Sequence, residues 1–233
     1  MLEIRDLHAG YGLSTVLDGV DLEVPDGSFV AVLGRNGMGK TTLCRAIMSL
    51  DPPSVTGGSI EYDGVELTDL PSHKVARTGI GYVPQGRHVF PTLDVVKNLT
   101  VAARGDGWTV EDVWQAFPRL EERKANDAGL LSGGEQQMLA IACAWMTNPR
   151  LLIMDEPSEG LAPIMIEAVA DQLGRLKEDG SISLLLVEQN YSLAIRLADV
   201  CYVLENGQVV FRGSADELEA DDEVKQRYLG VGV

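Results

Sequence analysis

The chain has 233 residues, 45% of them hydrophobic, which is enough for one large domain with a sizeable core. It carries 35 acidic and 19 basic residues, a formal net charge of -16, and this acidity argues against nucleic acid as a partner because phosphate backbones require a basic surface. No apolar run approaches the roughly 20 residues of a membrane-spanning helix and no signal peptide precedes Leu2, so we expect the chain to stay in the cytoplasm.

The N-terminal residues alternate in polarity. Leu2 and Ile4 alternate with the charged residues Glu3 and Arg5, and the same pattern returns from Val20 to Val24. Such alternation is typical of half-exposed antiparallel strands. We therefore expect an antiparallel sheet at the start of the chain.

A phosphate-binding sequence follows the first continuously apolar run. Residues 29–33 (Phe-Val-Ala-Val-Leu) are apolar throughout, as a buried parallel strand requires. Residues 34–42 then read G-R-N-G-M-G-K-T-T and fit the pattern G-x-x-x-x-G-K-T, the P-loop. Four apolar residues after them share one face of a helix: Leu43, Ala46, Ile47 and Leu50. A strand before and a helix after are the context that this motif requires.

The residue types of this loop suit a polyphosphate. Glycines allow backbone N–H groups to turn inward around phosphate oxygens, and the following helix directs its free N–H groups at the same anion. Lys40 is expected to reach the β- and γ-phosphates, and the Thr41 hydroxyl to coordinate Mg²⁺. The sequence thus predicts a nucleotide site made by Gly34, Arg35, Asn36, Gly37, Met38, Gly39, Lys40, Thr41 and Thr42.

Short strands and then helices are expected in the middle of the chain. Gly57-Gly58 is expected to open a strand from Ser59 to Tyr62, and another strand is expected at residues 80–83, ending at Pro84-Gln85. From Gly86 to Arg150 strand patterns disappear, and helical patterns replace them at 94–104, 109–117 and 134–147. The last of these is apolar nearly all round, which predicts a buried helix. We expect a helical insert between two halves of an α/β core.

The sequence L-S-G-G-E-Q, residues 131–136, predicts a second anion site. Ser132 and Glu135 match the capping box S-x-x-E, which by itself indicates only a well-capped helix. Two glycines in the first turn are costly for a helix, however, and leave its N–H groups bare. A bare helix N-terminus attracts anions. The chain therefore carries two phosphate-binding helix termini, although one ATP needs only one of them.

Buried strands resume after the insert. The apolar runs are residues 151–154, 184–187 and 200–204, and a helical pattern separates the first two. This alternation predicts a doubly wound α/β sheet. Asn206-Gly207 favours a hairpin, and the tail from Ser214 is expected to hold two short acidic helices.

Two carboxylates follow the strand at residues 151–154. Asp155 and Glu156 lie at its carboxyl end, where open α/β sheets bind their ligands. A P-loop site requires one carboxylate to hold the Mg²⁺ shell and another group to orient the attacking water. We assign the first role to Asp155 and the second to Glu156. An apolar run that ends in Asp-Glu is a weak signal alone, and the P-loop upstream makes it a strong one.

With the P-loop before it and Asp-Glu after it, L-S-G-G-E-Q makes the chain resemble an ABC-transporter ATPase subunit over essentially its whole length. The resemblance implies an α/β fold in a single ABC ATPase domain. Residues 1–85 and 151–233 would form a P-loop NTPase (RecA-like) core with an N-terminal antiparallel β-subdomain, and residues 86–150 an inserted α-helical subdomain with the signature motif. It also implies ATP and Mg²⁺ as cofactors and a second ABC ATPase subunit, a copy or a paralogue, packed head to tail. Each ATP would be held between the P-loop of one subunit and the signature helix of the other.

The same resemblance implies a place on the cytoplasmic face of the cell membrane. Integral membrane permease subunits are the implied partners, and an extracytoplasmic substrate-binding protein would act indirectly. Arg87, His88 and Phe90 are candidates for the contact with a permease, because they follow Gln85 and supply charge and an aromatic anchor. The alternative is a loop that packs on its own subdomain.

Further roles follow position by position from the resemblance. Tyr11 matches the aromatic residue that stacks on adenine, although Tyr-Gly is otherwise an ordinary turn. Gln85 matches a glutamine that coordinates Mg²⁺ and senses the transport partner. The implied catalytic residues are Lys40, Glu156 and Gln189; the implied metal ligands are Thr41, Gln85 and Asp155; the implied signature contacts to nucleotide are Ser132, Gly133, Gly134 and Glu135.

Two positions depart from the family pattern. Gln189 stands at the switch position, where histidine is usual; glutamine can hydrogen-bond a γ-phosphate oxygen but cannot carry a proton charge. Ala162 stands where an aspartate usually follows Gly-Leu, which leaves open the cross-dimer contact of that aspartate.

Three segments narrow the resemblance to the ATP-binding subunit of branched-chain amino acid importers, the LivF type. They read V-E-Q-N (187–190), D-E-P-S-E-G-L-A-P (155–163) and Y-V-P-Q-G-R (82–87). This resemblance implies an ATPase that powers amino acid import. A urea or short-chain amide importer is the alternative within the class. A non-transport ABC ATPase that acts as a protein-assembly scaffold is the alternative from another class.

Overall fold

An antiparallel sheet forms the N-terminal part of the molecule. The computed structural model describes residues 1–105, 107–180 and 182–230. The strands of this sheet are β1 (Leu2–Tyr11), β2 (Ser14–Val24), β4 (Ser54–Tyr62) and β5 (Val65–Glu66), in the order β2-β1-β4-β5. Leu2 and Ile4 of β1 are buried and pair with Val24 and Leu22 of β2. The alternation of polarity therefore predicted this sheet correctly.

A second sheet of six strands carries the P-loop. Its strands are β3 (Phe29–Leu33), β6 (Ile80–Val83), β7 (Leu151–Asp155), β8 (Ser183–Glu188), β9 (Val200–Glu205) and β10 (Gln208–Ser214). The order is β10-β9-β3-β8-β7-β6, in which β10 is antiparallel to β9 and the other neighbours are parallel. β3, β7 and β8 are buried along their whole length, as their continuous apolar runs predicted.

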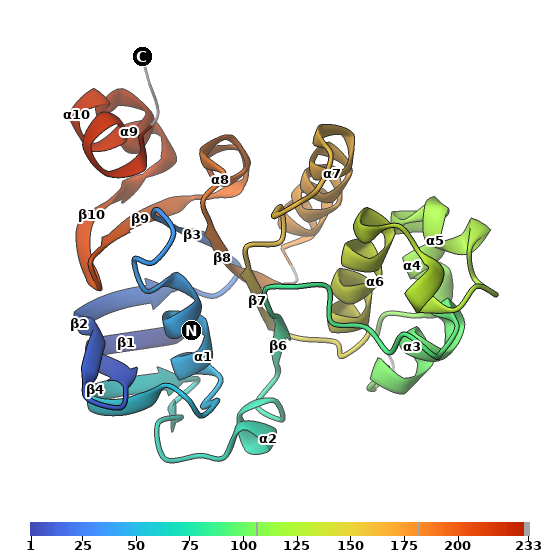
Figure 1. Cartoon of the computed structure of the whole chain (residues 1–233), viewed down its shortest axis with the longest axis horizontal. Coiled ribbons are helices and arrows are strands. Elements are labelled where there is room, and N and C mark those ends of the chain that lie inside the picture. Colours follow the sequence, from blue (N-terminus) through green and yellow to red (C-terminus); the bar gives the residue numbers. More distant parts are fainter. Residues whose placement is uncertain (106, 181, 231–233) are drawn as a thin grey trace.

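Helix α1 (Lys40–Ile47) lies between the two sheets (Figure 1). It contacts β1, β2 and β4 of the antiparallel sheet and β7 and β8 of the other sheet. Leu43 and Ile47 of its apolar face are fully buried, in a core that also contains Ile4 and Val32. Because both sheets hold α1, the P-loop that precedes it has a rigid base.

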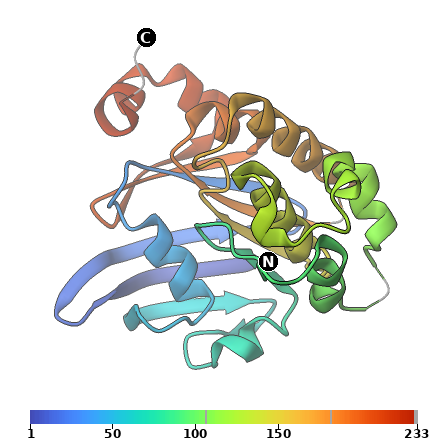
Figure 2. The same cartoon turned by 45° about the vertical axis from the view of Figure 1, so that its right-hand side comes forward.

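The helices between Val95 and Trp145 form an arm beyond the β6 edge of the six-stranded sheet (Figures 1 and 2). They are α3 (Val95–Ala102), α4 (Val110–Ala116), α5 (Pro118–Glu122) and α6 (Gly133–Trp145), with a 3-10 turn at Ala128–Leu130. The ring of Trp145 packs 5.0 Å from that of Trp108 and 5.2 Å from that of Phe117, centroid to centroid. The sequence did not predict α5, which Pro118 starts directly after Phe117 because its fixed φ suits the first turn of a helix.

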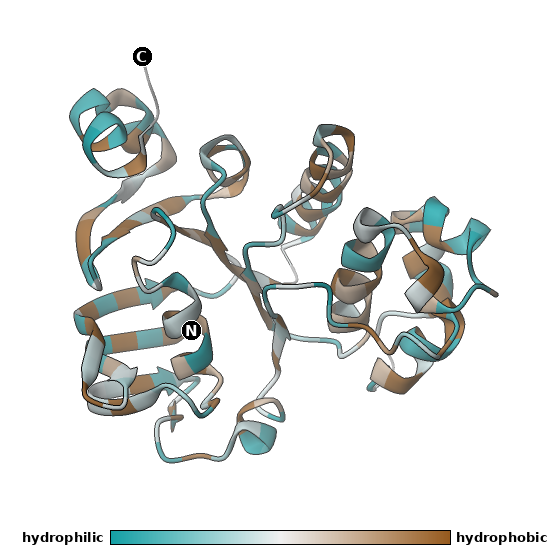
Figure 3. Ribbon diagram, viewed as in Figure 1, coloured by the Kyte–Doolittle hydropathy of each residue, from teal (hydrophilic) through white to brown (hydrophobic). Residues whose placement is uncertain are grey.

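Most of the remaining helices cover the six-stranded sheet or its β10 edge, and the short helix before β6 lies apart from them (Figure 1). Brown, hydrophobic residues fill the central strands, whereas the helices carry both brown and teal residues (Figure 3). These helices are α2 (Ser72–Val75), α7 (Pro163–Asp179), α8 (Tyr191–Leu197), α9 (Ala215–Ala220) and α10 (Asp222–Val224), followed by a π-helical turn at Lys225–Leu229. Within the described residues, no helix has the length and apolarity needed to cross a membrane. The α/β fold class predicted from the sequence is confirmed.

One strand boundary was predicted wrongly. β4 begins at Ser54, so Gly57 and Gly58 lie inside the strand and do not open it. Gly58 has φ +82, and a Cβ added there would overlap the backbone of Arg5 and Asp6 on β1. The pairing of β1 with β4 shifts register at this point. The glycine therefore permits a close approach of two backbones at a bulge.

Candidate active site

The P-loop occupies residues 34–39, between the end of β3 and the start of α1. Gly39 precedes the helix with φ +106, a backbone conformation that an L side chain rarely adopts. A Cβ at Gly39 would also overlap the side chain of Leu17. The motif therefore sits in the strand, loop and helix context that the sequence predicted.

Lys40 is buried inside its own loop. Its Nζ donates to the carbonyl oxygens of Gly34 at 2.7 Å and Arg35 at 2.9 Å. The same Nζ lies 2.9 Å from Glu156 Oε1. A lysine that already faces backbone oxygens and a carboxylate is placed to exchange them for phosphate oxygens.

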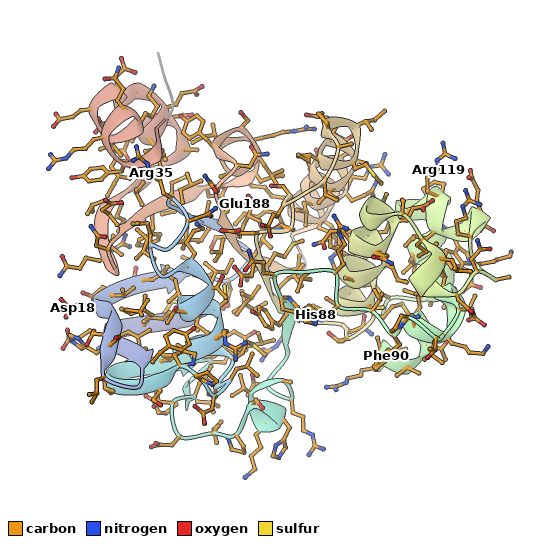
Figure 4. All side chains as sticks on the ribbon, in the orientation of Figure 1. Asp18, Arg35, His88, Phe90, Arg119 and Glu188 are labelled. Atoms are coloured by element: carbon orange, nitrogen blue, oxygen red, sulfur yellow. The ribbon has the colours of Figure 1, made fainter. Side chains whose placement is uncertain are left out.

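Other residues of the loop fasten it to the C-terminal part of the chain. The Gly207 N–H, in the turn between β9 and β10, donates to the Met38 carbonyl at 3.1 Å. The Arg35 guanidinium donates to the Arg227 carbonyl at 3.4 Å, and Figure 4 shows Arg35 below the C-terminal helices. The side chain of Arg35 therefore braces the loop against the tail of the chain.

Asp155 ends β7 and is fully buried beside the P-loop. Thr41 Oγ1 donates to its Oδ1 at 3.2 Å, and its Oδ2 has no hydrogen-bond partner among the described residues. Burial raises the pKa of this carboxyl to about 6, and the neighbouring charge of Glu156 adds to the rise. An unpaired carboxylate oxygen next to a hydroxyl is the oxygen set that Mg²⁺ prefers, so the residues present fit this ion.

Glu156 follows Asp155 in a strained backbone conformation, with φ +49. Its N–H donates to the Val187 carbonyl of β8 at 2.8 Å, which holds the strained turn in place. Its carboxylate meets Lys40 through Oε1 and accepts a hydrogen bond from Gln85 Nε2 on Oε2 at 3.2 Å. A cavity of about 230 Å³ is lined by the P-loop together with Gln85 and Glu156. The structure therefore brings both motifs and Gln85 to one place.

Gln189 and Tyr11 lie at the margins of this cavity. Gln189, exposed after β8, lines an adjoining cavity of about 250 Å³ together with Asn36 and Glu156. Tyr11 ends β1, 39% exposed, with its hydroxyl 3.4 Å from Thr42 Oγ1. Its ring is therefore accessible beside the first turn of α1, where an adenine base of a bound nucleotide could stack.

The signature residues lie apart from both cavities. Ser132 caps α6: its Oγ accepts from the Glu135 N–H, and the Glu135 carboxylate accepts from the Ser132 N–H at 2.8 Å. A Cβ on Gly133 would overlap the guanidinium of Arg87, and a Cβ on Gly134 would overlap Met165. Arg87 Nη2 also donates to the Gly160 carbonyl at 3.2 Å. Because the two glycines have no side chains, Arg87 and Met165 can pack directly against the first turn of α6.

Sequence reasoning missed Glu188, which ends β8 with only 1% of its side chain exposed. Its carboxylate accepts hydrogen bonds from the N–H groups of Ser158 at 2.9 Å, Gln189 at 3.1 Å and Asn190 at 3.0 Å. Burial raises the pKa of this carboxyl. Glu188 thereby joins the loop after β7 to the loop after β8, near the centre of Figure 4. Its signal was an acidic residue at the end of an apolar run, the same pattern that identified Asp155.

Relatives of known name match nearly the whole chain. The high-affinity branched-chain amino acid transport ATP-binding protein BraG of Pseudomonas aeruginosa is 42% identical, covering 99% of this chain and 100% of that protein. The probable branched-chain amino acid transport ATP-binding protein LivF of Archaeoglobus fulgidus is 38% identical, with 99% of each chain covered.

Solved structures and a family model agree with these relatives. A structure described as the ATP binding subunit of an ABC transporter has a TM-score of 0.80 and 30% identity, covering 99% of this chain and 96% of the other. A dimeric post-hydrolysis state of the ATP-binding cassette MJ0796, bound to ADP and Pi, has a TM-score of 0.75 and 26% identity, covering 92% of this chain and 99% of the other. Residues 17–159 match the family model described as ABC transporter. The chain therefore belongs to the ABC transporter family, and it is an ATPase subunit of that family.

Proposed function

We propose that this chain binds ATP with Mg²⁺ and hydrolyses it to power an importer of branched-chain amino acids. The observation that carries the ATPase part is the single cavity lined by Lys40, Thr41, Gln85 and Glu156. The cargo follows from the likeness to BraG and LivF, both named for branched-chain amino acid transport. Urea import and protein assembly remain as outcomes of the experiment below.

The residues of the cavity divide the work of phosphoryl transfer. Lys40 binds the β- and γ-phosphates, Glu156 orients the attacking water, and Gln189 hydrogen-bonds a γ-phosphate oxygen. Thr41, Asp155 and Gln85 would hold Mg²⁺, which when bound neutralises charge on the β- and γ-phosphates. Most of the catalysis is thus positioning and charge neutralisation by groups that the fold holds in advance.

A second ATPase subunit completes the site. Ser132 to Glu135 line neither cavity of their own chain within the described residues, so a head-to-tail partner supplies the signature helix to each nucleotide. The cassette MJ0796, 26% identical to this chain, has dimeric structures, which supports the pairing of two ATPase subunits. The partner is a copy of this chain or a paralogue. Ala162 offers no side-chain oxygen for the contact that an aspartate makes in other members of the family.

The loop after Gln85 is the proposed contact with an integral membrane permease, on the cytoplasmic face of the membrane. Buried Asn98 accepts from the Phe90 N–H at 2.8 Å and donates to the Phe90 carbonyl at 3.1 Å, while 56% of Phe90 stays exposed. A fixed backbone with an exposed aromatic ring is the form of an interface anchor. Figure 4 shows His88 beside β6 and Phe90 beside the helical arm, in the segment that joins the two. An extracytoplasmic substrate-binding protein would deliver the cargo to the permease.

The deciding experiment is uptake of labelled leucine, isoleucine, valine and urea in cells that lack this protein. Wild type and Lys40→Ala are compared for rescue. Loss of branched-chain uptake that only the wild type restores supports the proposal. Loss of urea uptake alone would instead indicate that the chain powers a urea importer. Normal uptake of all four compounds in the cells that lack the protein would favour the assembly scaffold, if the wild-type protein is also absent from the membrane fraction of cells that express it.

A further inference from the structure

The side-chain amide of Gln85 lies between two carboxylates. Its Nε2 donates to Glu159 Oε2 at 2.9 Å and to Glu156 Oε2 at 3.2 Å. An ionised carboxylate only accepts hydrogen bonds, whereas an amide has a donating end and an accepting end. The two acids therefore fix which end of the amide faces them. The Gln85 oxygen must point the other way.

The only side-chain hydrogen bond of Glu159 in the described part of the chain comes from Gln85. Glu159 is exposed and makes no ion pair there. Glu156, by contrast, also pairs with Lys40 and is assigned to the attacking water. When nucleotide occupies the cavity, Glu156 has other partners. Glu159 is the carboxylate that remains for the Gln85 amide.

The loop that carries Glu159 is held on both sides. The Glu159 N–H donates to the Glu156 carbonyl at 3.1 Å, and Arg87 donates to the carbonyl of the next residue, Gly160, at 3.2 Å. Glu188 fixes the preceding Ser158 N–H at 2.9 Å. A carboxylate on a braced turn loses little further freedom when it orients a neighbouring side chain.

We propose that Glu159 is a positioning residue that orients the Gln85 amide so that its oxygen, and not its NH₂ group, is presented to Mg²⁺. This inference rests on the proposed function, in which Gln85 coordinates the ion. Mg²⁺ accepts oxygen ligands in a strict geometry, so a rotated amide cannot replace a correctly oriented one. Removal of a partner that orients a metal ligand typically lowers metal affinity by about 10- to 100-fold.

The test uses binding of a fluorescent, non-hydrolysable ATP analogue to the full-length chain, with Mg²⁺ and with EDTA. The dissociation constant in EDTA divided by that in Mg²⁺ reports how strongly Mg²⁺ supports nucleotide binding. Glu159→Ala should lower this ratio by about tenfold and leave the value in EDTA unchanged. Unchanged binding in EDTA also shows that the variant is folded. Glu178→Ala is the matched control, because it removes an exposed carboxylate from α7 and should leave both constants as in wild type.

A double-mutant cycle separates orientation from simple loss of charge. If Glu159 acts through Gln85, Glu159→Ala should change the ratio less than about twofold in a Gln85→Ala background. If Glu159→Ala lowers the ratio equally in both backgrounds, Glu159 acts by its charge and not through Gln85. If it does not lower the ratio in the wild-type background, Glu159 has no role in Mg²⁺ binding. Either result overturns the inference while the proposed function stands. A wild type whose analogue binding does not respond to Mg²⁺ would instead defeat the proposed function, and this inference with it.

Discussion

Lys40 Nζ lies 2.9 Å from Glu156 Oε1, and both side chains are almost completely buried. Under the proposed function, the lysine that binds phosphate and the glutamate that orients the attacking water are therefore ion-pair partners in this structure. In the proposed mechanism, a γ-phosphate bound by Lys40 would take the place of this carboxylate. Glu156 would then be free to orient the attacking water, as the proposed mechanism requires.

Glu156→Gln should separate binding from hydrolysis. The amide cannot assist proton transfer, so we expect kcat to fall by at least about 100-fold. Affinity for ATP should stay the same or rise, because a neutral partner holds Lys40 less tightly. Steady-state hydrolysis and equilibrium binding of a fluorescent ATP measure the two effects, with Glu178→Gln as the control for an exposed carboxylate. Wild-type turnover in the variant would remove Glu156 from the catalytic role.

Gly133→Ala tests whether the packing of Arg87 on the signature helix matters for hydrolysis. The added methyl group would overlap the guanidinium and displace it from the Gly160 carbonyl. Because an alanine in a helix is favoured over glycine by up to about 1 kcal/mol, the free energy of unfolding should not fall. ATPase activity should fall by roughly 10- to 100-fold as the first turn of α6 and the Gly160 loop lose their common partner.

Gly174→Ala supplies the matched control for that substitution. Gly174 lies in α7, and nothing lies within 4 Å of a Cβ added there. Gly174→Ala should raise the free energy of unfolding by up to about 1 kcal/mol, because Gly174 lies inside a helix, and should leave the ATPase activity unchanged. Arg87→Ala should reproduce the loss seen with Gly133→Ala, and the double variant should be no worse than either. Additive losses would show that Gly133 and Arg87 act independently.

The parts of the site that sequence could predict are those whose chemistry lies in one short segment. The P-loop residues and the pair Asp155-Glu156 could be placed together because parallel strands bring their carboxyl ends to one edge of a sheet. Thr41 and Asp155, far apart in sequence, are hydrogen-bonded as this rule requires.

The missed features depend on contacts between segments that no local pattern relates. Glu159 reaches Gln85, and Arg87 reaches Gly133, across loops whose relative positions follow only from the packed core. Gly58 was misread because the bulge that it accommodates lies on another strand, at Asp6. Tertiary packing fixes such contacts, and turn propensity alone therefore misassigned this glycine.

Tyr11→Ala should weaken nucleotide binding through the base alone. Loss of stacking is worth about 1 to 3 kcal/mol, or roughly 5- to 150-fold in the dissociation constant of ATP. Binding of inorganic tripolyphosphate should stay unchanged, because the P-loop that receives it is intact. Tyr11→Phe keeps the ring and loses only the hydroxyl near Thr42, so it should bind ATP as wild type does. An equal loss for ATP and tripolyphosphate in Tyr11→Ala would mean that Tyr11 supports the loop and not the base.

Asp155→Asn should stabilise the metal-free chain while it abolishes Mg²⁺-dependent hydrolysis. Burial raises the pKa of Asp155 from 3.8 to about 6, so the folded chain binds this proton more tightly than the unfolded chain does. The contribution of Asp155 to the free energy of unfolding is therefore greatest below pH 3.8 and is lost as the pH rises to about 6. This difference in pKa corresponds to at most about 3 kcal/mol. In EDTA, urea unfolding should show the variant about 1 to 3 kcal/mol more stable than wild type near pH 8, and nearly equal to it near about pH 4. A variant that is less stable than wild type at every pH would mean that protein groups stabilise the ionised carboxylate without a metal ion. Its Oδ2 would then not be available to a cation.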